Sequence, residues 1–283
     1  MTTLEEKKFP NERDLYHAND LVLVNCSFDG IEDGESALKE ANNIILNHCY
    51  FNLRYPLWHD TKILANDIVM TANCRAALWY SNDIEINNSR LLGIKALREC
   101  QNIIINKTEI DSPEFGWRSK DINLNEVKIT SEYLFFEAKN LLIDKLEFTG
   151  KYSFQYVENM EIINSELNTK DAFWHSKNVT IKNSIVKGEY LGWYSENLTF
   201  INCKIIGTQP LCYCKNLKLI NCTMEQTDLS FEYSDVEADI KGNILSVKNP
   251  FKGKIKADNI DEIILTDDSV YPNQCEIVTL IKE

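Results

Sequence analysis

Aromatic side chains with polar neighbours are the residues of this sequence best suited to binding chemistry. Each of the five tryptophans is followed directly by a histidine, tyrosine, arginine or similar polar residue. With Tyr213, the set is Trp58, His59, Trp79, Tyr80, Trp117, Arg118, Trp174, His175, Trp193, Tyr194 and Tyr213. A large aromatic surface on a soluble protein marks an interaction site. Flat rings beside polar groups suit a sugar ring or a partner protein, provided that one face of the fold presents them together.

The sequence repeats itself, and the repeat decides where these residues lie. The segments 158–176, 177–195 and 196–214 are each 19 residues long and carry the same residue types at the same places. With Lys177 as position 1, units continue back to Asn19 and, more faintly, forward to about Thr266. Such a period indicates a solenoid of stacked units, here called coils. We expect a single domain with about twelve coils over 19–266, an N-terminal cap and half-coil at 1–18 and a C-terminal tail or cap at 267–283.

Apolar and polar residues alternate within each unit. Positions 3 and 5 are apolar, as in Val179 and Ile181, and position 4 between them is mostly polar. Alternation over a short run followed by a turn signal predicts a strand. The natural closure is an all-β, single-stranded parallel β-helix (β-solenoid), in which equivalent residues stack about 4.8 Å apart. Position 16 is chiefly Leu or Phe and points inward, so the tryptophans at position 17 are predicted to point outward on one face, partly exposed.

Asparagine recurs at positions 2 and 7, for example in Asn178, Asn197 and Asn216. Asparagine tolerates the left-handed backbone that a sharp corner needs. A column of asparagines can also hydrogen-bond along the stack, as asparagine ladders do in cross-β assemblies. We interpret these residues as a structural asparagine ladder.

Several segments resemble one protein family in order and spacing, over essentially the whole chain. They are PLWHD (56–60), ALWYS (77–81), DAFWHS (171–176), EYLGWYS (189–195), LTFINC (198–203), LCYC (211–214), SFEYS (230–234), SVKNP (246–250) and IKAD (255–258), with the loop GESALKE at 34–40. These segments are similar to the uncharacterised family numbered 3737 among the domains of unknown function. The resemblance implies a bacterial protein with a right-handed, pectin-lyase-like β-helix. It implies no activity, because none is assigned to the family.

Carboxylates at position 18 offer a catalytic alternative. Glu99 and Glu137 would lie two coils apart, roughly 9.6 Å by strand spacing, near the upper end of the gap between the carboxylates of inverting glycosidases. Arg118 lies between them, however, and a structural Glu-Arg-Glu stack explains the three residues more simply. The Asp clusters of pectate-lyase-like enzymes and the Gly-His-Gly segment of polygalacturonases are not found. We therefore assign no catalytic residue and keep these three as the candidates.

Metal and thiol chemistry have less support. Three position-18 residues could meet a metal only across loosely spaced coils: His17, Glu40 and His59. One acidic loop could hold calcium or simply be solvated: Asp29, Glu32, Asp33 and Glu35. Cysteines that stack at position 8, Cys26 on Cys49 and Cys203 on Cys222, are expected as buried free thiols that fill space. No metal and no cofactor are predicted.

Charge and composition argue against several function classes. The net charge is −13 at pH 7, whereas binding to nucleic acid or an anionic membrane needs clustered Lys and Arg. No run approaches the roughly 18 apolar residues of a membrane span. The N-terminus lacks the apolar core of a signal peptide. Nine cysteines without an export signal indicate reduced thiols in the cytoplasm.

The preferred hypothesis is a cytoplasmic, non-catalytic or weakly catalytic protein that binds carbohydrate through the Trp/Tyr/His face. One alternative is a polysaccharide-active enzyme, a glycoside hydrolase or lyase, with carboxylates on that face. Another is an interaction or assembly scaffold whose tryptophan column is covered by a protein partner. The oligomeric state and the identity of the ligand stay open at this level.

Overall fold

The computed structural model describes residues 1–30 and 34–280, which form parallel β-strands and one short 3₁₀ helix. Each strand pairs with its equivalent one coil further along the chain. Val179 lies opposite Leu198, for example, and Ile181 lies opposite Phe200. The chain is a right-handed parallel β-helix, as predicted. It divides into two compact units, Met1–Glu147 and Phe148–Glu283. None of the residues described here forms a helix long and apolar enough to cross a membrane.

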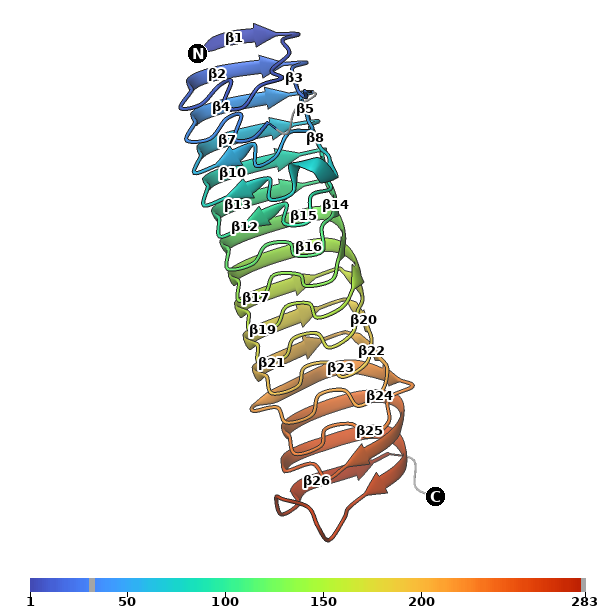
Figure 1. Cartoon of the computed structure of the whole chain (residues 1–283). Coiled ribbons are helices and arrows are strands. Elements are labelled where there is room, and N and C mark those ends of the chain that lie inside the picture. The colour runs from blue at the N-terminus through green and yellow to red at the C-terminus, as the bar shows by residue number, and fades with distance from the viewer. Residues whose placement is uncertain (31–33, 281–283) are drawn as a thin grey trace. The chain divides into compact units, whose positions relative to one another are not determined.

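Three rows of strands form the coils of the first unit (Figure 1). The first row holds β2 (Asn19–Val24), β4 (Asn42–Asn47), β7 (Thr61–Asn66), β10 (Asn82–Asn87) and β13 (Gln101–Asn106). The second row holds β3 (Ser27–Phe28), β5 (Tyr50–Phe51), β8 (Val69–Met70), β11 (Arg90–Leu91) and β14 (Glu109–Asp111). The third holds β6 (Leu57–Trp58), β9 (Leu78–Trp79) and β12 (Leu97–Arg98). In the last two coils of the unit, one continuous strand replaces the separate strands of the first two rows. These strands are β15 (Lys120–Ser131) and β16 (Lys139–Gly150), and β16 extends beyond Glu147, the last residue of the unit.

The second unit keeps the first two rows of strands. Its first row holds β17 (Glu158–Ile163), β19 (Lys177–Lys182) and β21 (Glu196–Ile201), and its second holds β18 (Glu166–Asn168), β20 (Ile185–Lys187) and β22 (Lys204–Ile206). Longer strands follow: β23 (Leu217–Glu225), β24 (Asp235–Lys248), β25 (Lys252–Ile264) and β26 (Gln274–Thr279). Turns at 172–175 and 191–194 take the place of the third row.

Two strands near the ends of the chain were not predicted. In the segment expected as a cap, β1 (Thr2–Glu5) pairs with β2 and places Leu4 opposite Leu23. In the segment expected as a C-terminal tail or cap, β26 pairs with β25 and places Ile277 opposite Ile255. Both strands lack the asparagines that mark the repeat, so periodicity alone could not place them.

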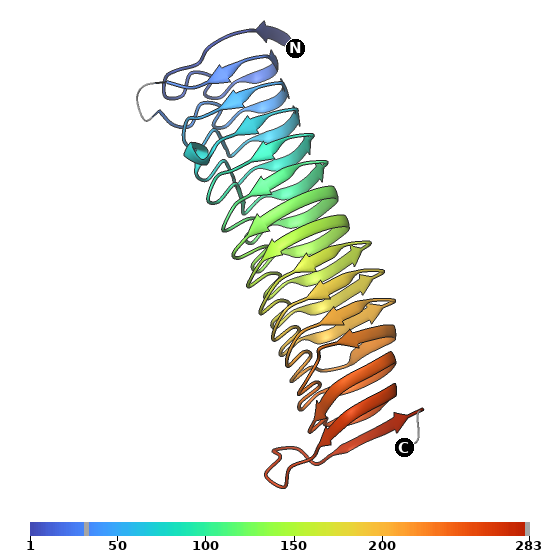
Figure 2. The same cartoon turned by 90° about the vertical axis from the view of Figure 1, so that its right-hand side faces the viewer.

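The unit 61–81 is two residues longer than the repeat. Its extra residues, near 71–75, form the 3₁₀ helix η1 (Ala72–Cys74), which projects from the side of the first unit (Figure 2). The Thr71 hydroxyl caps its start by accepting a hydrogen bond from the Asn73 backbone N–H (3.3 Å). The insertion is thereby accommodated without a shift in the strands on either side, since β7 still pairs in register with β10.

The interior is a stack of apolar side chains. In the first unit the rings of Phe28 and Phe51 lie parallel with their centroids 4.5 Å apart. In the second unit Phe154 and Phe173 stack at 5.3 Å. Gly116 takes the inward position 16 at φ +78°, and a β-carbon there would meet the Phe135 ring at 2.2 Å. A glycine is therefore required to admit the neighbouring phenylalanine.

Residues at the corners of the coils adopt the left-handed backbone conformation. Asn178, Asn197 and Asn216 have φ of 54°, 55° and 52°. The side-chain amide of Asn197 donates to Asn178 Oδ1 (2.8 Å), and that of Asn216 donates to Asn197 Oδ1 (2.7 Å). We call these residues, with Asn159, the asparagine column of the second unit. The side chains of this column lie at a corner of each coil, and their hydrogen bonds link one coil to the next.

The cysteines at position 8 are free and buried. Cys49 donates its S–H to the Leu23 carbonyl oxygen at 3.5 Å, and Cys203 donates to that of Ile181 at 3.3 Å. Burial raises the pKa of the Cys49 and Cys222 thiols to about 11. These thiols are therefore unreactive space-filling groups.

Candidate functional site

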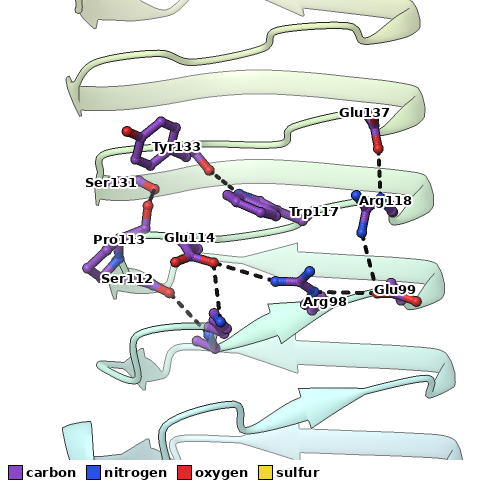
Figure 3. Close-up of polar contacts among 12 residues, drawn as sticks. Arg98, Glu99, Ser112, Pro113, Glu114, Trp117, Arg118, Ser131, Tyr133 and Glu137 are labelled. Carbon is purple, nitrogen blue, oxygen red and sulfur yellow. Dashed lines mark hydrogen bonds and ion pairs between the residues drawn. The ribbon is translucent and has the colours of Figure 1, made fainter.

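The tryptophans at position 17 are half-buried and held to the backbone. In the first unit, the indole Nε1–H of Trp58 donates to Ala76 O at 2.7 Å. That of Trp117 donates to Tyr133 O, also at 2.7 Å (Figure 3). In the second unit, the same group of Trp174 donates to Tyr190 O (2.6 Å) and that of Trp193 to Gln209 O (2.8 Å). Each acceptor is the position-14 carbonyl of the next coil. The indole N–H groups of these four residues are thus hydrogen-bonded within the protein.

The faces of the tryptophan rings are also largely occupied. In the first unit, the Arg98 guanidinium lies 5.0 Å from the centroid of Trp79 and 4.8 Å from that of Trp117. In the second unit, Trp174 and Trp193 stack with centroids 5.4 Å apart and 5° between their planes. Rings that cover one another leave their edges to solvent. The column is therefore half-exposed, as the alternation predicts, without being an open aromatic platform.

The position-18 residues of the first unit include one stacked pair of rings and a row of ion pairs. The ring of His59 stacks on that of Tyr80 at 5.1 Å. Arg118 contacts the carboxylates on both neighbouring coils, Glu137 at 2.7 Å and Glu99 at 4.0 Å (Figure 3). Hydrogen bonding to Glu137 raises the pKa of Arg118. A catalytic pair would need one carboxylate free of this arginine, and the geometry does not provide it.

The residues considered for metal binding do not converge. His17 Nδ1 lies 3.9 Å from Glu40 Oε2, which also accepts a hydrogen bond from the Tyr16 hydroxyl (2.8 Å). Over residues 1–30 and 34–280, no three His, Cys, Asp or Glu side chains lie close enough to hold a metal ion. In the acidic loop, Asp29 accepts from Asn52 and Glu35 pairs with Arg54. The other two candidates, Glu32 and Asp33, lie outside the described residues.

The second unit carries a column of parallel aromatic rings at position 18. Centroids are 4.8 Å apart from Tyr156 to His175, 5.0 Å from His175 to Tyr194 and 4.7 Å from Tyr194 to Tyr213, with planes within 8–12°. Both faces of His175 and Tyr194 are therefore covered by neighbouring rings. Only the ring edges of these two residues and the Tyr194 hydroxyl can meet a ligand.

This parallel stacking ends at Tyr213. The next ring, Tyr233, is tilted by 53° with its centroid 5.8 Å away. Tyr271, from the loop 265–273 between β25 and β26, stands edge-on to Tyr233 at 5.5 Å and lies 5.1 Å from Phe251. The loop is held by hydrogen bonds from Asn249 to Thr266 (3.0 Å) and from Thr266 N–H back to Asn249 (2.9 Å). The tilted rings open a space that the parallel stack does not have.

A groove of about 480 Å³ occupies this space. Its lining comes from four consecutive coils and the loop: Tyr194, Glu196, Asn197, Tyr213, Cys214, Lys215, Asn216, Tyr233, Asp235, Phe251, Lys252 and Tyr271. Three strand spacings give it a length of roughly 14 Å. The volume lies within the range of small-molecule sites, which is about 300–1,000 Å³.

The polar groups of the groove balance in charge. Asp235 pairs with Lys252 (Oδ2 to Nζ, 3.3 Å). Glu196 and Lys215 are exposed on neighbouring coils, and neither makes an ion pair within 4.0 Å to a residue in the described ranges. Burial, together with nearby Glu232, raises the pKa of the Tyr213 hydroxyl to about 12. That hydroxyl therefore stays protonated at neutral pH and can donate a hydrogen bond.

Of the eleven residues predicted to bind a ligand, Tyr194 and Tyr213 line this groove and the other nine do not. Tyr233 occupies position 18 and could have been added from the repeat alone. Phe251 and Tyr271 carried no such signal, because the first lies in a faint repeat and the second in the C-terminal tail.

A second hollow, of about 500 Å³, lies in the first unit over position 2 and its neighbours. Part of its polar lining is paired internally. Asn102 donates to Asp83 Oδ1 and Asn140 to Asp121 Oδ1, both at 2.8 Å. No aromatic residue lines it. The groove in the second unit is therefore the better candidate site.

Comparison with solved structures finds remote likenesses only. The chain is similar to the catalytic domain of GH87 alpha-1,3-glucanase in complex with nigerose at 9% identity and a TM-score of 0.30, covering 93% of this chain and 64% of that one. It thus spans less than two thirds of that domain. It is similar to a mutant of the periplasmic alginate epimerase AlgG at 9% identity and a TM-score of 0.25, covering 92% and 76%.

A third likeness is to QnrB1, a plasmid-mediated fluoroquinolone resistance protein, at 10% identity and a TM-score of 0.24, covering 70% of this chain and 93% of that one. Scores this low carry no argument about function. Among curated proteins, none matches the sequence. A family model described as "Protein of unknown function (DUF3737)" matches residues 2–278, and the chain therefore belongs to this family.

Proposed function

We propose that the second unit binds carbohydrate in the groove between Tyr213, Tyr233 and Tyr271. The observation that supports this proposal is that the parallel stack of rings ends at Tyr213. Within the stack, neighbouring rings cover both faces of Tyr194, whereas the 53° tilt of Tyr233 turns an aromatic wall toward open space. An apolar wall with a few convergent polar groups is the usual form of a small-molecule site.

The polar groups of the groove suit a ligand rich in hydroxyl groups. Asn216 supplies an amide oxygen as acceptor and the Tyr213 hydroxyl supplies a donor beside the aromatic wall. Glu196, Lys215, Asp235 and Lys252 together contribute no net charge. A neutral saccharide can hydrogen-bond to such groups while its ring contacts an aromatic side chain.

The proposal concerns binding and not hydrolysis. Glycoside hydrolysis normally uses two carboxyl groups, one on each side of the bond that breaks. In the groove, Asp235 is held by Lys252, which leaves Glu196 as the remaining carboxylate of the lining. The pair Glu99 and Glu137 in the first unit is bound by Arg118.

Titration calorimetry with linear trisaccharides tests the proposal. The panel is cellotriose, laminaritriose, xylotriose and trigalacturonic acid, each added to the full chain. At least one neutral trisaccharide should bind, and Tyr271→Ala should weaken its binding about tenfold, because an aromatic contact contributes about 0.5–1.5 kcal/mol beyond the area it buries.

Tyr50→Ala is the matched control. Tyr50 is 39% exposed and Tyr271 is 46% exposed, but Tyr50 belongs to the first unit and is not among the residues that line the groove. Its replacement should leave the affinity unchanged. Equal effects of the two substitutions, or no binding of any neutral member of the panel, would contradict the proposal.

A further inference from the structure

The amide columns of this protein have a direction. In the first unit, Asn102 donates to Asp83 and Asn140 donates to Asp121, each on the preceding coil. An ionised carboxylate can only accept a hydrogen bond. The aspartates therefore fix the orientation of the asparagines that contact them: N–H points toward the N-terminal side of the stack and the carbonyl oxygen toward the C-terminal side.

The asparagine column of the second unit has the same direction and ends in the groove. Its last donor is Asn216, whose N–H meets Asn197 Oδ1 at 2.7 Å. The next coil has no asparagine at this place, because Asp235 directly precedes Val236, which lies opposite Leu217. Asp235 cannot donate. Within the described ranges, no hydrogen bond reaches Asn216 Oδ1, and the residue is exposed.

Two acceptors thus follow one another at this point of the groove, the amide oxygen of Asn216 and the carboxylate of Asp235. Hydrogen bonds in a chain polarise one another, so the oxygen at the end of the column is a stronger acceptor than an isolated amide. A group that donates a hydrogen bond is favoured there. An anionic group is disfavoured at this point, because it would face two acceptors and because the charge of the neighbouring Lys215 is offset by Glu196 on the adjacent coil.

We propose that Asn216 Oδ1 accepts a hydrogen bond from a ligand hydroxyl and makes the groove selective for neutral polyhydroxylated rings over acidic ones. This inference rests on the proposed function and adds the residue that sets its specificity. The aromatic wall supplies contact area, and the end of the asparagine column supplies the directional contact.

Asn221 provides a matched control. It ends the second asparagine column of the same unit, in which Asn202 donates to Asn183 (3.2 Å) and Asn221 donates to Asn202 (2.6 Å). Asn216 and Asn221 both have φ of 52° and both are exposed. Asn221 does not line the groove. Glycine accepts a positive φ without steric cost, so Asn216→Gly and Asn221→Gly should perturb the fold equally.

The experiment measures binding of the same four trisaccharides to wild type, Asn216→Gly, Asn221→Gly and Tyr271→Ala, with circular dichroism as the check of folding. Asn216→Gly should weaken binding of the neutral trisaccharide about tenfold, the size expected for one hydrogen bond at the end of a polarised chain. Asn221→Gly should change it less than about twofold. Trigalacturonic acid should bind wild type more weakly than the neutral compounds.

The outcomes separate this inference from the one on which it rests. Equal affinities of the two glycine variants, with the loss in Tyr271→Ala retained, would overturn the role of Asn216 and leave carbohydrate binding intact. Tighter binding of trigalacturonic acid than of the neutral trisaccharides would overturn the proposed selectivity. A wild-type protein that binds none of the panel would overturn both.

Discussion

Replacing Arg98 tests whether the tryptophan column stabilises the fold. The Arg98 side chain is 13% exposed and lies between the rings of Trp79 and Trp117, with centroid distances of 5.0 and 4.8 Å. It also contacts Glu99 Oε1 at 3.4 Å and Glu114 Oε2 at 3.5 Å (Figure 3). The variant Arg98→Ala removes all four contacts.

The expected loss of stability follows from these contacts. Two cation–π contacts at a partly buried site contribute about 1–2 kcal/mol together. Two charged hydrogen bonds add about 1–2 kcal/mol in net terms. Glu114 keeps a second partner in Lys95 at 3.5 Å, so no carboxylate is left buried alone. We expect Arg98→Ala to lower the free energy of unfolding by about 2–4 kcal/mol.

Urea denaturation followed by tryptophan fluorescence measures this loss, and the native emission should also change because Arg98 flanks two tryptophans. Arg90→Ala is the control. Arg90 pairs with Glu109 at 3.2 Å in the same unit, but its side chain is 54% exposed, and an exposed ion pair contributes less than about 1 kcal/mol. If Arg98→Ala costs no more than Arg90→Ala, the column does not act as a structural element.

Three further predictions concern the core, the pH dependence of stability and the tryptophans. Phe200→Ala should lower the free energy of unfolding by about 3–5 kcal/mol, because the ring is fully buried and its loss leaves a cavity; a urea midpoint close to that of wild type would contradict this. Burial raises the pKa of Asp60 well above its ordinary value, and its Oδ2 has no partner among residues 1–30 and 34–280. The folded state therefore holds a proton that the unfolded chain releases above about pH 4. Wild type should lose stability relative to Asp60→Asn as the pH rises above about 4, where the unfolded chain gives up the proton that the folded state retains, and parallel urea midpoints for the two proteins would refute the assignment. Acrylamide should quench the native tryptophan fluorescence in part, since all five indoles are half-buried; fluorescence that acrylamide does not affect would place the column in the core or an interface.

Much of the fold could be predicted because the repeat constrains both the strands and their register. Apolar residues at positions 3 and 5 predicted which side chains point inward, and Val179 does lie opposite Leu198. Position 17 was correctly expected to be partly exposed. A 19-residue period in which each residue type recurs leaves little freedom in how one coil rests on the next.

The candidate site was predicted only in part, for two physical reasons. The indole N–H groups of Trp117 and Trp174 donate to backbone carbonyl oxygens of the next coil. Every residue type has a backbone carbonyl group, so the sequence does not reveal such an acceptor. The groove depends on Tyr271, which reaches Tyr233 from a loop outside the repeat. Tertiary contacts of a non-repeating segment cannot be obtained from periodicity.

The spacing of side-chain hydrogen bonds between coils restricts how the length of this chain can change. Asn178, Asn197 and Asn216 are linked across steps of 19 residues. Deleting or duplicating one whole coil would place equivalent residues opposite each other again and keep the register of the strands. An insertion of any other length must bulge out of the stack, as η1 does. Tolerated insertions and deletions are therefore expected in steps of one coil, or as loops at corners.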